Sequence, residues 1–146
     1  MPEAGDVPDD ASIPDESAVY RRITLEWYKV DPSMGDRRLT TAAFSDLGDA
    51  MSVAIGVDLE AGGHEPAEVV ANHPGYGLVA LPVDELRRLG LGVVRSAIDG
   101  EVCHGDVYGK KTRSTKKKLR DLAEQRWILK PASPDDDPEQ PDADGE

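Results

Sequence analysis

Hydrophobic and polar residues alternate over two stretches, and a period of two is typical of strands with one buried face. The first stretch, at 19–30, places these residues on its apolar side: Val19, Ile23, Leu25 and Trp27. Arg21 interrupts that side, and burial of an arginine is costly unless it is paired. We therefore expect Arg21 or Arg22 to leave the apolar face or to find partners there, with a rim position favoured.

The second alternating stretch is at 51–59, where Met51 begins a row of apolar residues separated by small or acidic ones. Between the two strands, 38–44 has the composition of a shorter extended segment. Downstream, Pro66 favours the start of a short helix over 66–72. The apolar run at 76–81 predicts a buried strand.

Two further helices have clear boundaries in the sequence. Pro82 favours the start of a helix whose apolar residues share one face, and Gly90 supplies its C-terminal residue. Near the C-terminus, Ser114 or Thr115 can cap a helix that runs to about Arg126. Its apolar stripe consists of Leu119, Leu122, Ala123 and Trp127.

A β-hairpin is predicted near 91–108, because only Asp99-Gly100 separates the apolar segments 91–98 and 101–108. An Asp-Gly pair suits a two-residue type I′ turn, so the two strands should be antiparallel neighbours. Hairpins mixed with short helices favour a compact α+β domain with a largely antiparallel sheet.

Charge divides the chain into three parts. The net charge of the whole chain is −12, but all of it comes from the two ends, at 1–18 and 131–146. Both ends contain many acidic, Pro, Gly and Ala residues and lack lysine and arginine. Such segments bury too little apolar surface to offset the entropy of ordering them, so we expect two disordered acidic tails flanking one domain at 19–130.

Several protein classes are disfavoured by the composition. The single cysteine, Cys103, excludes an internal disulfide framework and a C-x-x-C motif, which suits the reducing cytoplasm. The acidic N-terminus does not resemble an export signal, and the longest uncharged run, at 69–83, is interrupted by proline, so no membrane helix is expected. We expect neither a metal nor a cofactor, since His64 and His73 lie in turn-like contexts without further ligands nearby.

A basic run at 109–120 is the strongest local feature of the nearly neutral domain. Its candidate anion-binding residues are Lys110, Lys111, Arg113, Lys116 and Lys117. Backbone and hydroxyl donors beside a helix start favour phosphate. A P-loop is excluded, because the glycine that this motif needs five residues before Gly109 is replaced by His104. The alternative interpretation is a solvated helix face.

His104 is the weak candidate for catalysis. Alternation on a strand places it on one face with Asp106 and Tyr108, an arrangement that could orient a substrate or transfer a proton. The same row could equally be the polar outer face of a hairpin. Cys103 points to the opposite face from its neighbour and is expected to pack as a small hydrophobe.

Short sequence pieces spread over about residues 20–130 resemble small prokaryotic proteins of unassigned function. These pieces are Arg22, Phe44, Met51-Ser52-Val53, Leu89-Gly90-Leu91, Val93-Val94, His104, Gly109-Lys110-Lys111-Thr112 and Leu122-Ala123. The resemblance implies one compact domain in which the His104 strand and the basic run belong together. It implies no activity.

Three functions fit these features, and the sequence favours a non-enzymatic one. The first is a cytoplasmic accessory protein that docks on a protein partner through its basic C-terminal segment. The second is a module that binds the phosphates of RNA or DNA through the same residues. The third is a small enzyme centred on His104.

Overall fold

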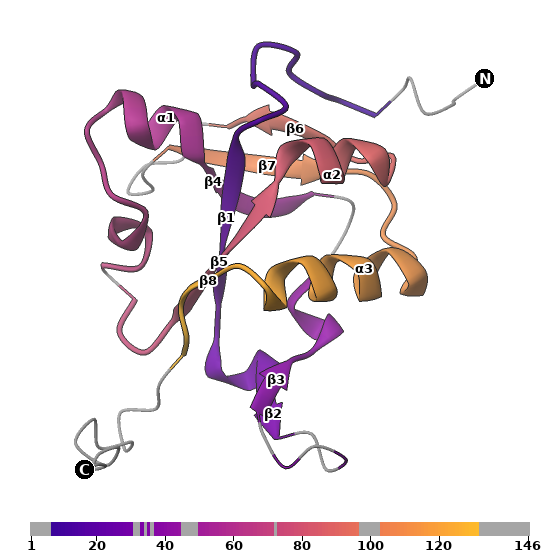
Figure 1. Ribbon diagram of the computed structural model, residues 1–146. Coiled ribbons are helices and arrows are strands. Elements are labelled where there is room, and N and C mark those ends of the chain that lie inside the picture. The colour runs from indigo at the N-terminus through magenta and orange to yellow at the C-terminus, as the bar shows by residue number, and fades with distance from the viewer. Residues whose placement is uncertain are drawn as a thin grey trace.

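The structure, a computed structural model, describes residues 7–30, 33, 35, 37–44, 50–71, 73–96 and 103–131. It confirms an α+β fold with an antiparallel sheet of six strands in the order β6-β7-β4-β1-β5-β8, while β2 and β3 form a separate pair (Figure 1). The strands are β1 (Ala18–Ile23), β2 (Tyr28–Val30), β3 (Arg37–Leu39), β4 (Met51–Ile55), β5 (Gly77–Pro82), β6 (Gly92–Arg95), β7 (His104–Tyr108) and β8 (Trp127–Leu129). The α-helices are α1 (Gly56–Ala61), α2 (Val83–Arg88) and α3 (Arg113–Glu124), and the 3₁₀ helices are η2 (Leu25–Trp27), η3 (Thr41–Phe44) and η4 (Pro66–Val70).

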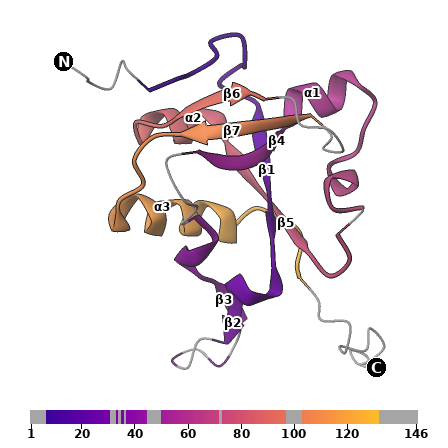
Figure 2. The same cartoon turned by 180° about the vertical axis from the view of Figure 1, so that it is seen from behind.

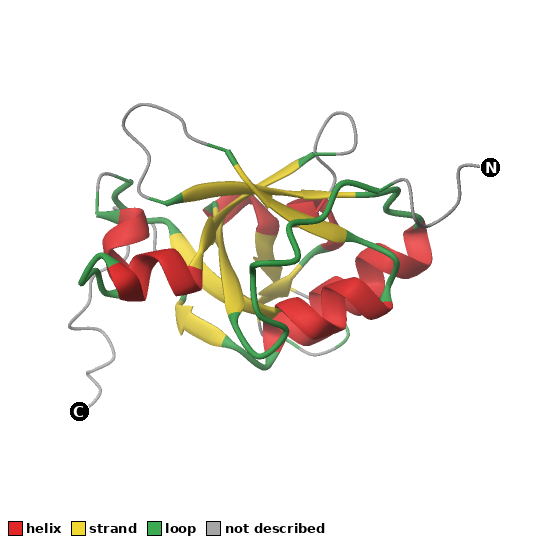
Figure 3. Ribbon diagram, turned by 90° about the horizontal axis from the view of Figure 1, so that it is seen from above, coloured by secondary structure: helices red, strands yellow, loops and turns green. Residues whose placement is uncertain are grey.

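The sheet is covered differently on its two faces. Helices α2 and α3 lie on one side of β1, and α1 and η4 lie on the other (Figures 1 and 2). Seen from above, the sheet lies between these two groups of helices (Figure 3). The α2–α3 side holds the larger core cluster, which includes the buried residues Ile23, Phe44, Leu81 and Leu119. A smaller cluster lies between the sheet and the helices α1 and η4. It contains Ala54, Leu59, Val69, Val70 and Leu78.

Strand β1 links two halves of the sheet that diverge from each other. It pairs with β5 along its whole length, over six residue pairs from Ala18↔Pro82 to Ile23↔Gly77. Its pairing with β4 is limited to Val19↔Ile55 and Tyr20↔Ala54. Beyond these two pairs the strands separate, and the β4-β7-β6 half crosses β1 at a steep angle (Figure 1).

Two predicted strands are shorter in the structure. The strand expected at 19–30 ends at Ile23 and is followed by η2 and β2, and the strand expected at 51–59 ends at Ile55, where α1 begins. The alternation in 56–59 did not indicate a strand, because these residues belong to helix α1. Leu59 is buried because it packs from this helix into the smaller core cluster. The extended segment expected at 38–44 is β3 followed by η3, and the predicted helix at 66–72 is the 3₁₀ helix η4.

The helices on the larger core follow their sequence signals. Helix α2 buries Val83 and Leu86, and Gly90 after it has a φ of 83°, the left-handed conformation that favours glycine. Helix α3 begins two or three residues earlier than expected, because Thr112 rather than Ser114 or Thr115 is the cap. The Thr115 backbone N–H donates to Thr112 Oγ1 at 3.2 Å.

The predicted hairpin strands are antiparallel neighbours, which confirms their pairing. Asp99 and Gly100, the predicted turn, lie outside the described residues. The register pairs Val93 with Val107, whereas a two-residue turn at 99–100 would pair Val93 with Asp106. The strands are therefore offset by one residue from the predicted hairpin, and Cys103 immediately before β7 has a φ of 53°.

Residues 7–17 pack against the domain, so the disordered tail expected at 1–18 does not extend over them. The Asp10 backbone N–H donates to Val93 O at 2.8 Å, and Asp9 Oδ1 accepts from the Val93 N–H at 2.9 Å, which covers the outer edge of β6. Ile13 is fully buried in the larger core. The backbone approaches so closely that a Cβ at position 92 would overlap Pro8 O, which explains Gly92.

Substitution of Ile13→Ala is expected to lower the free energy of unfolding by about 2–5 kcal/mol, because it removes buried apolar surface and leaves a cavity. The matched control is Ile128→Ala, at a side chain that is 45% exposed, where the cost should be about 0.5 kcal/mol or less. Urea denaturation measures both. Equal stability of the two variants would show that residues 7–17 do not contribute to the core.

Candidate functional site

The basic run surrounds the start of α3, but its five candidate anion-binding residues do not form one surface. Lys110, Arg113 and Lys117 are exposed, as is the neighbouring Lys118, whereas Lys116 is only half-exposed. The Lys111 ammonium turns back and donates to Val107 O at 3.1 Å and to Gly109 O at 3.0 Å. Lys111 therefore holds its own loop in place.

We call the exposed set, Lys110, Arg113, Lys117 and Lys118, the basic face. Leu119 and Ala123 anchor the opposite side of α3 in the larger core without exposed surface. The C-terminal end of the helix is fixed by Glu124, whose carboxylate accepts hydrogen bonds from the Leu39 backbone N–H and from Trp127 Nε1. The basic face is thus presented on a rigidly anchored helix.

His104 lies on the opposite face of the sheet, on the side of α1 and η4, and shares that face with Asp106 and Tyr108 as expected. Its register partner on β4 is Ala54, which in turn pairs with Tyr20 on β1. The side chain is only 8% exposed, and its Nδ1 lies 2.8 Å from Ser96 O. His104 is therefore a buried residue of the sheet face, not part of the polar outer surface of a hairpin.

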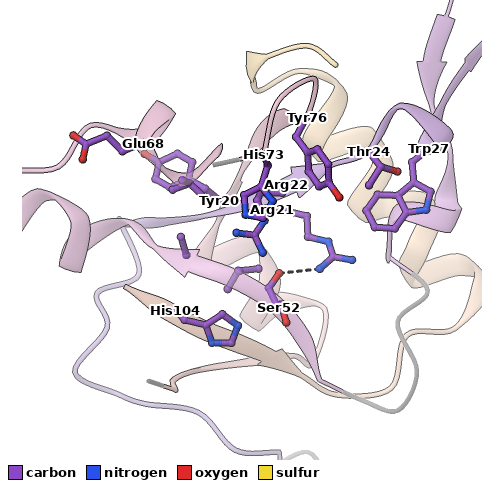
Figure 4. Close-up of a pocket in the computed structure, with 13 residues that line it drawn as sticks. Tyr20, Arg21, Arg22, Thr24, Trp27, Ser52, Glu68, His73, Tyr76 and His104 are labelled. Carbon is purple, nitrogen blue, oxygen red and sulfur yellow. Dashed lines mark hydrogen bonds between the residues drawn. The ribbon is translucent and has the colours of Figure 1, made fainter. Parts of the chain in front are cut away.

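A pocket of about 190 Å³ opens on this face, where β1 and β4 diverge and η4 borders the sheet (Figure 4). His104 lines it together with Arg21, Arg22, Ser52, Val53 and Ala54 from the strands. The remaining lining residues are Tyr20, Thr24, Trp27, Glu68, Val69, His73 and Tyr76. Asp106 and Tyr108, the predicted partners of His104, are absent from this lining.

Arg21 closes the gap between the diverging strands. Its guanidinium donates to Ser52 O at 2.8 Å and, through Nε and the second terminal nitrogen, to Ala43 O at 3.1 and 2.9 Å. It also lies 5.2 Å from the centre of the Trp27 ring, within cation–π distance. Arg21 is only 6% exposed, so it is the arginine that finds partners on the buried face. The prediction of a position at the rim of the sheet is therefore wrong for Arg21.

Arg22 points to the other face, and sequence reasoning did not connect it with the aromatic residues around the pocket. Figure 4 shows Arg22 close to His73 and Tyr76, with His104 across the pocket from them. His73 was expected to be a simple loop residue, but its ring lies 5.1 Å from that of Tyr76. The available signal was the placement of Tyr20 and Arg22 at alternate positions of one strand.

Among the residues that the structure describes, neither thiol chemistry nor a metal site is indicated. Burial raises the pKa of the Cys103 thiol above its ordinary value of 9.0, and the Asp58 carboxylate adds to this effect, so the reactive thiolate is disfavoured. Cys103 packs against the smaller cluster, as expected for a small hydrophobe. Across the described ranges, no group of three His, Cys, Asp or Glu side chains is arranged to hold a metal ion.

Comparisons with protein-family models, with curated proteins and with solved structures find no match to this chain. In the part of the chain that the structure describes, none of the helices combines the length and the apolar character that crossing a membrane requires. The functional argument therefore rests on the geometry of the basic face and of the pocket.

Substitution of Arg21→Met is expected to lower the free energy of unfolding by about 2 kcal/mol or more, because it leaves Ser52 O and Ala43 O without this donor. The control Arg37→Met changes an exposed arginine of β3 and should cost about 0.5 kcal/mol or less. Thermal and urea unfolding measure both variants. If Arg21→Met is as stable as the control, the strands do not depend on this guanidinium.

Proposed function

We propose that this chain is a cytoplasmic accessory protein that docks on an acidic surface of a protein partner through the basic face. The supporting observation is the exposure of Lys110, Arg113, Lys117 and Lys118 together at the start of a helix whose other side is buried. Opposite charges steer a partner toward such a surface and orient it there.

The arrangement of charge elsewhere in the domain supports this assignment. Arg95 forms a bidentate pair with Asp58, at 2.7 and 3.0 Å, and also contacts Asp10 at 3.0 Å. Arg87 pairs with Asp9 and Asp15. These arginines serve to hold the N-terminal segment on the domain, whereas the basic face has cations directed to solvent.

A protein partner is favoured over nucleic acid because no aromatic side chain interleaves with the cations of the basic run. Proteins that hold single-stranded nucleic acid combine a cationic groove with aromatic side chains on which bases stack. Phosphate contact alone would give binding without sequence preference and with a strong salt dependence. This second mode serves as the alternative in the experiment.

The double variant Lys117→Glu with Lys118→Glu is expected to weaken binding to poly-L-glutamate about tenfold or more at low salt, because repulsion replaces attraction. Fluorescence anisotropy with labelled poly-L-glutamate measures the affinity. The control, Arg88→Glu with Lys130→Glu, makes the same change in net charge at exposed positions outside the basic face, and its affinity should fall much less.

A single-stranded DNA oligonucleotide of matched charge is measured in parallel. Tighter binding of the DNA at equal ionic strength, lost in the Lys117/Lys118 variant, would replace the protein partner with nucleic acid. If the wild-type chain binds neither polymer at low salt, or if both double variants behave alike, the basic face is only a solvated surface.

Removal of residues 132–146 is expected to strengthen binding to poly-L-glutamate, because the seven acidic residues of this segment compete for the basic face at high effective concentration. The gain should shrink as salt is raised, since screening weakens both interactions. The control keeps the length of the segment and replaces its acids with Asn and Gln. If the truncated chain and the neutral control bind no better than the wild type, the segment does not compete.

A further inference from the structure

Residues 7–15, drawn in indigo above β6 in Figure 1, lie along the outer edge of the sheet, and we call them the strap. Two of its residues satisfy both backbone groups of Val93 in β6. The Asp10 backbone N–H donates to the Val93 carbonyl, and the Asp9 carboxylate accepts from the Val93 N–H. The strap therefore occupies the place where a further strand would pair with β6.

Only one strap residue, Ile13, is buried in the larger core, and the other strap residues are half-buried or exposed. The centre of the sheet is held much more extensively, since β1 pairs with β5 over six residue pairs. Segments with few buried apolar contacts and with exposed hydrogen bonds open at a lower free energy than the core that they cover. The strap thus has the features of a unit that opens before the domain unfolds.

Arg87 of α2 contacts the strap with its whole guanidinium. Its Nε lies 3.2 Å from Asp9 Oδ1, Nη1 pairs with Asp15, and Nη2 donates to Asp10 O at 3.0 Å. The Arg87 side chain is 21% exposed and that of Asp15 is 68% exposed, so water and ions reach this cluster. Arg87 therefore connects two ends of the strap through contacts that salt can screen.

Arg95 at the end of β6 contacts the middle of the strap. Its Nη1 lies 3.0 Å from Asp10 Oδ2 and 2.8 Å from Ser12 Oγ, while Nε and Nη2 pair with Asp58 of α1. Hydrogen bonds from the Ser12 hydroxyl and backbone N–H, more than the charge of Arg95, lower the pKa of Asp10 below its ordinary value of 3.8. Asp10 is therefore ionised at neutral pH, and Arg95 attracts a full negative charge.

The strap is thus held by charges near the surface and by one apolar side chain in the core. Added salt weakens attraction between exposed charges, because ions screen it over about 8–10 Å at physiological ionic strength and over shorter distances above that. The backbone pairing of β1 with β5 does not rely on such charges. The same salt should therefore leave the centre of the sheet closed.

We propose that the strap opens as a unit while the six-stranded sheet stays folded, and that ionic strength sets how often it is open. Opening releases the N–H and the carbonyl of Val93 and vacates the site of Ile13 in the larger core. A sheet edge with unpaired backbone groups can pair with an extended segment of another chain. The strap therefore controls access to the β6 edge, and this control does not depend on the proposed docking through the basic face.

Amide hydrogen exchange of the full chain, followed by NMR, tests the proposal, because the Val93 N–H is held by the strap and exchanges when the strap opens. Sodium chloride is raised from about 0.05 M to about 0.5 M at constant neutral pH. Exchange of Val93 is expected to become about fivefold faster relative to the amides of β1 and β5, which serve as the internal reference. If Val93 is as strongly protected as these amides, or if salt leaves its relative exchange unchanged, the proposal is overturned.

Substitution of Arg87→Gln is expected to make exchange of Val93 about tenfold faster at low salt, relative to the same reference, because charge-assisted hydrogen bonds to the strap are lost. The matched control Arg88→Gln changes the next arginine, which is 70% exposed and pairs with Glu85 on its own helix, and should leave Val93 unchanged. Equal exchange in the two variants overturns the proposal. If Arg87→Gln does not fold, Asp15→Asn, at a largely exposed side chain, replaces it and is interpreted in the same way.

Discussion

The guanidinium of Arg21 is the contact on which the geometry of the domain depends. It lies where β1 and β4 stop pairing and donates to carbonyl oxygens of Ser52 and Ala43, which belong to β4 and to η3. Burial of an arginine is tolerated only when its donors are satisfied. The hydrogen bonds of Arg21 to Ser52 O and Ala43 O meet this condition across the gap between β1 and β4. Arg21 thus bridges the strands at the place where the sheet diverges and where the pocket opens.

The unequal covering of the sheet explains why the pocket is polar. Helices α2 and α3 and the helix η3 bury the face that contains Val19 and Ile23, so apolar side chains are required there. Helices α1 and η4 cover only part of the opposite face, where Leu78 and Ala54 are buried. Polar residues such as Arg22 and His104 lie at the border of this partial cover. Their position between solvent and the core gives them fixed orientations.

Sequence patterns predicted the elements whose signals are local. The buried residues Leu119 and Ala123 of α3, the glycine after α2 and the pairing of β6 with β7 all follow from neighbouring residues, whereas the cap of α3 was placed two to three residues too late. Ile13 was missed because one apolar residue among acids carries no periodic signal, and its burial depends on a distant core. The interruption of alternation by Arg21 was visible, but its partner carbonyls belong to segments far along the chain. The pocket could not be predicted for the same reason, since its residues converge from separate strands and a turn.

The basic face and the pocket beside β1 differ in physical character. Cations on the basic face are solvated, so their attraction is long-ranged, screened by salt and tolerant of the partner's shape. His104 in the pocket is largely removed from solvent and held by its contact with Ser96 O, so its hydrogen bond is stronger and more directional than a contact of a solvated cation. Because the two surfaces lie on opposite faces of one sheet, a macromolecule that docked on the basic face as proposed would not cover the pocket.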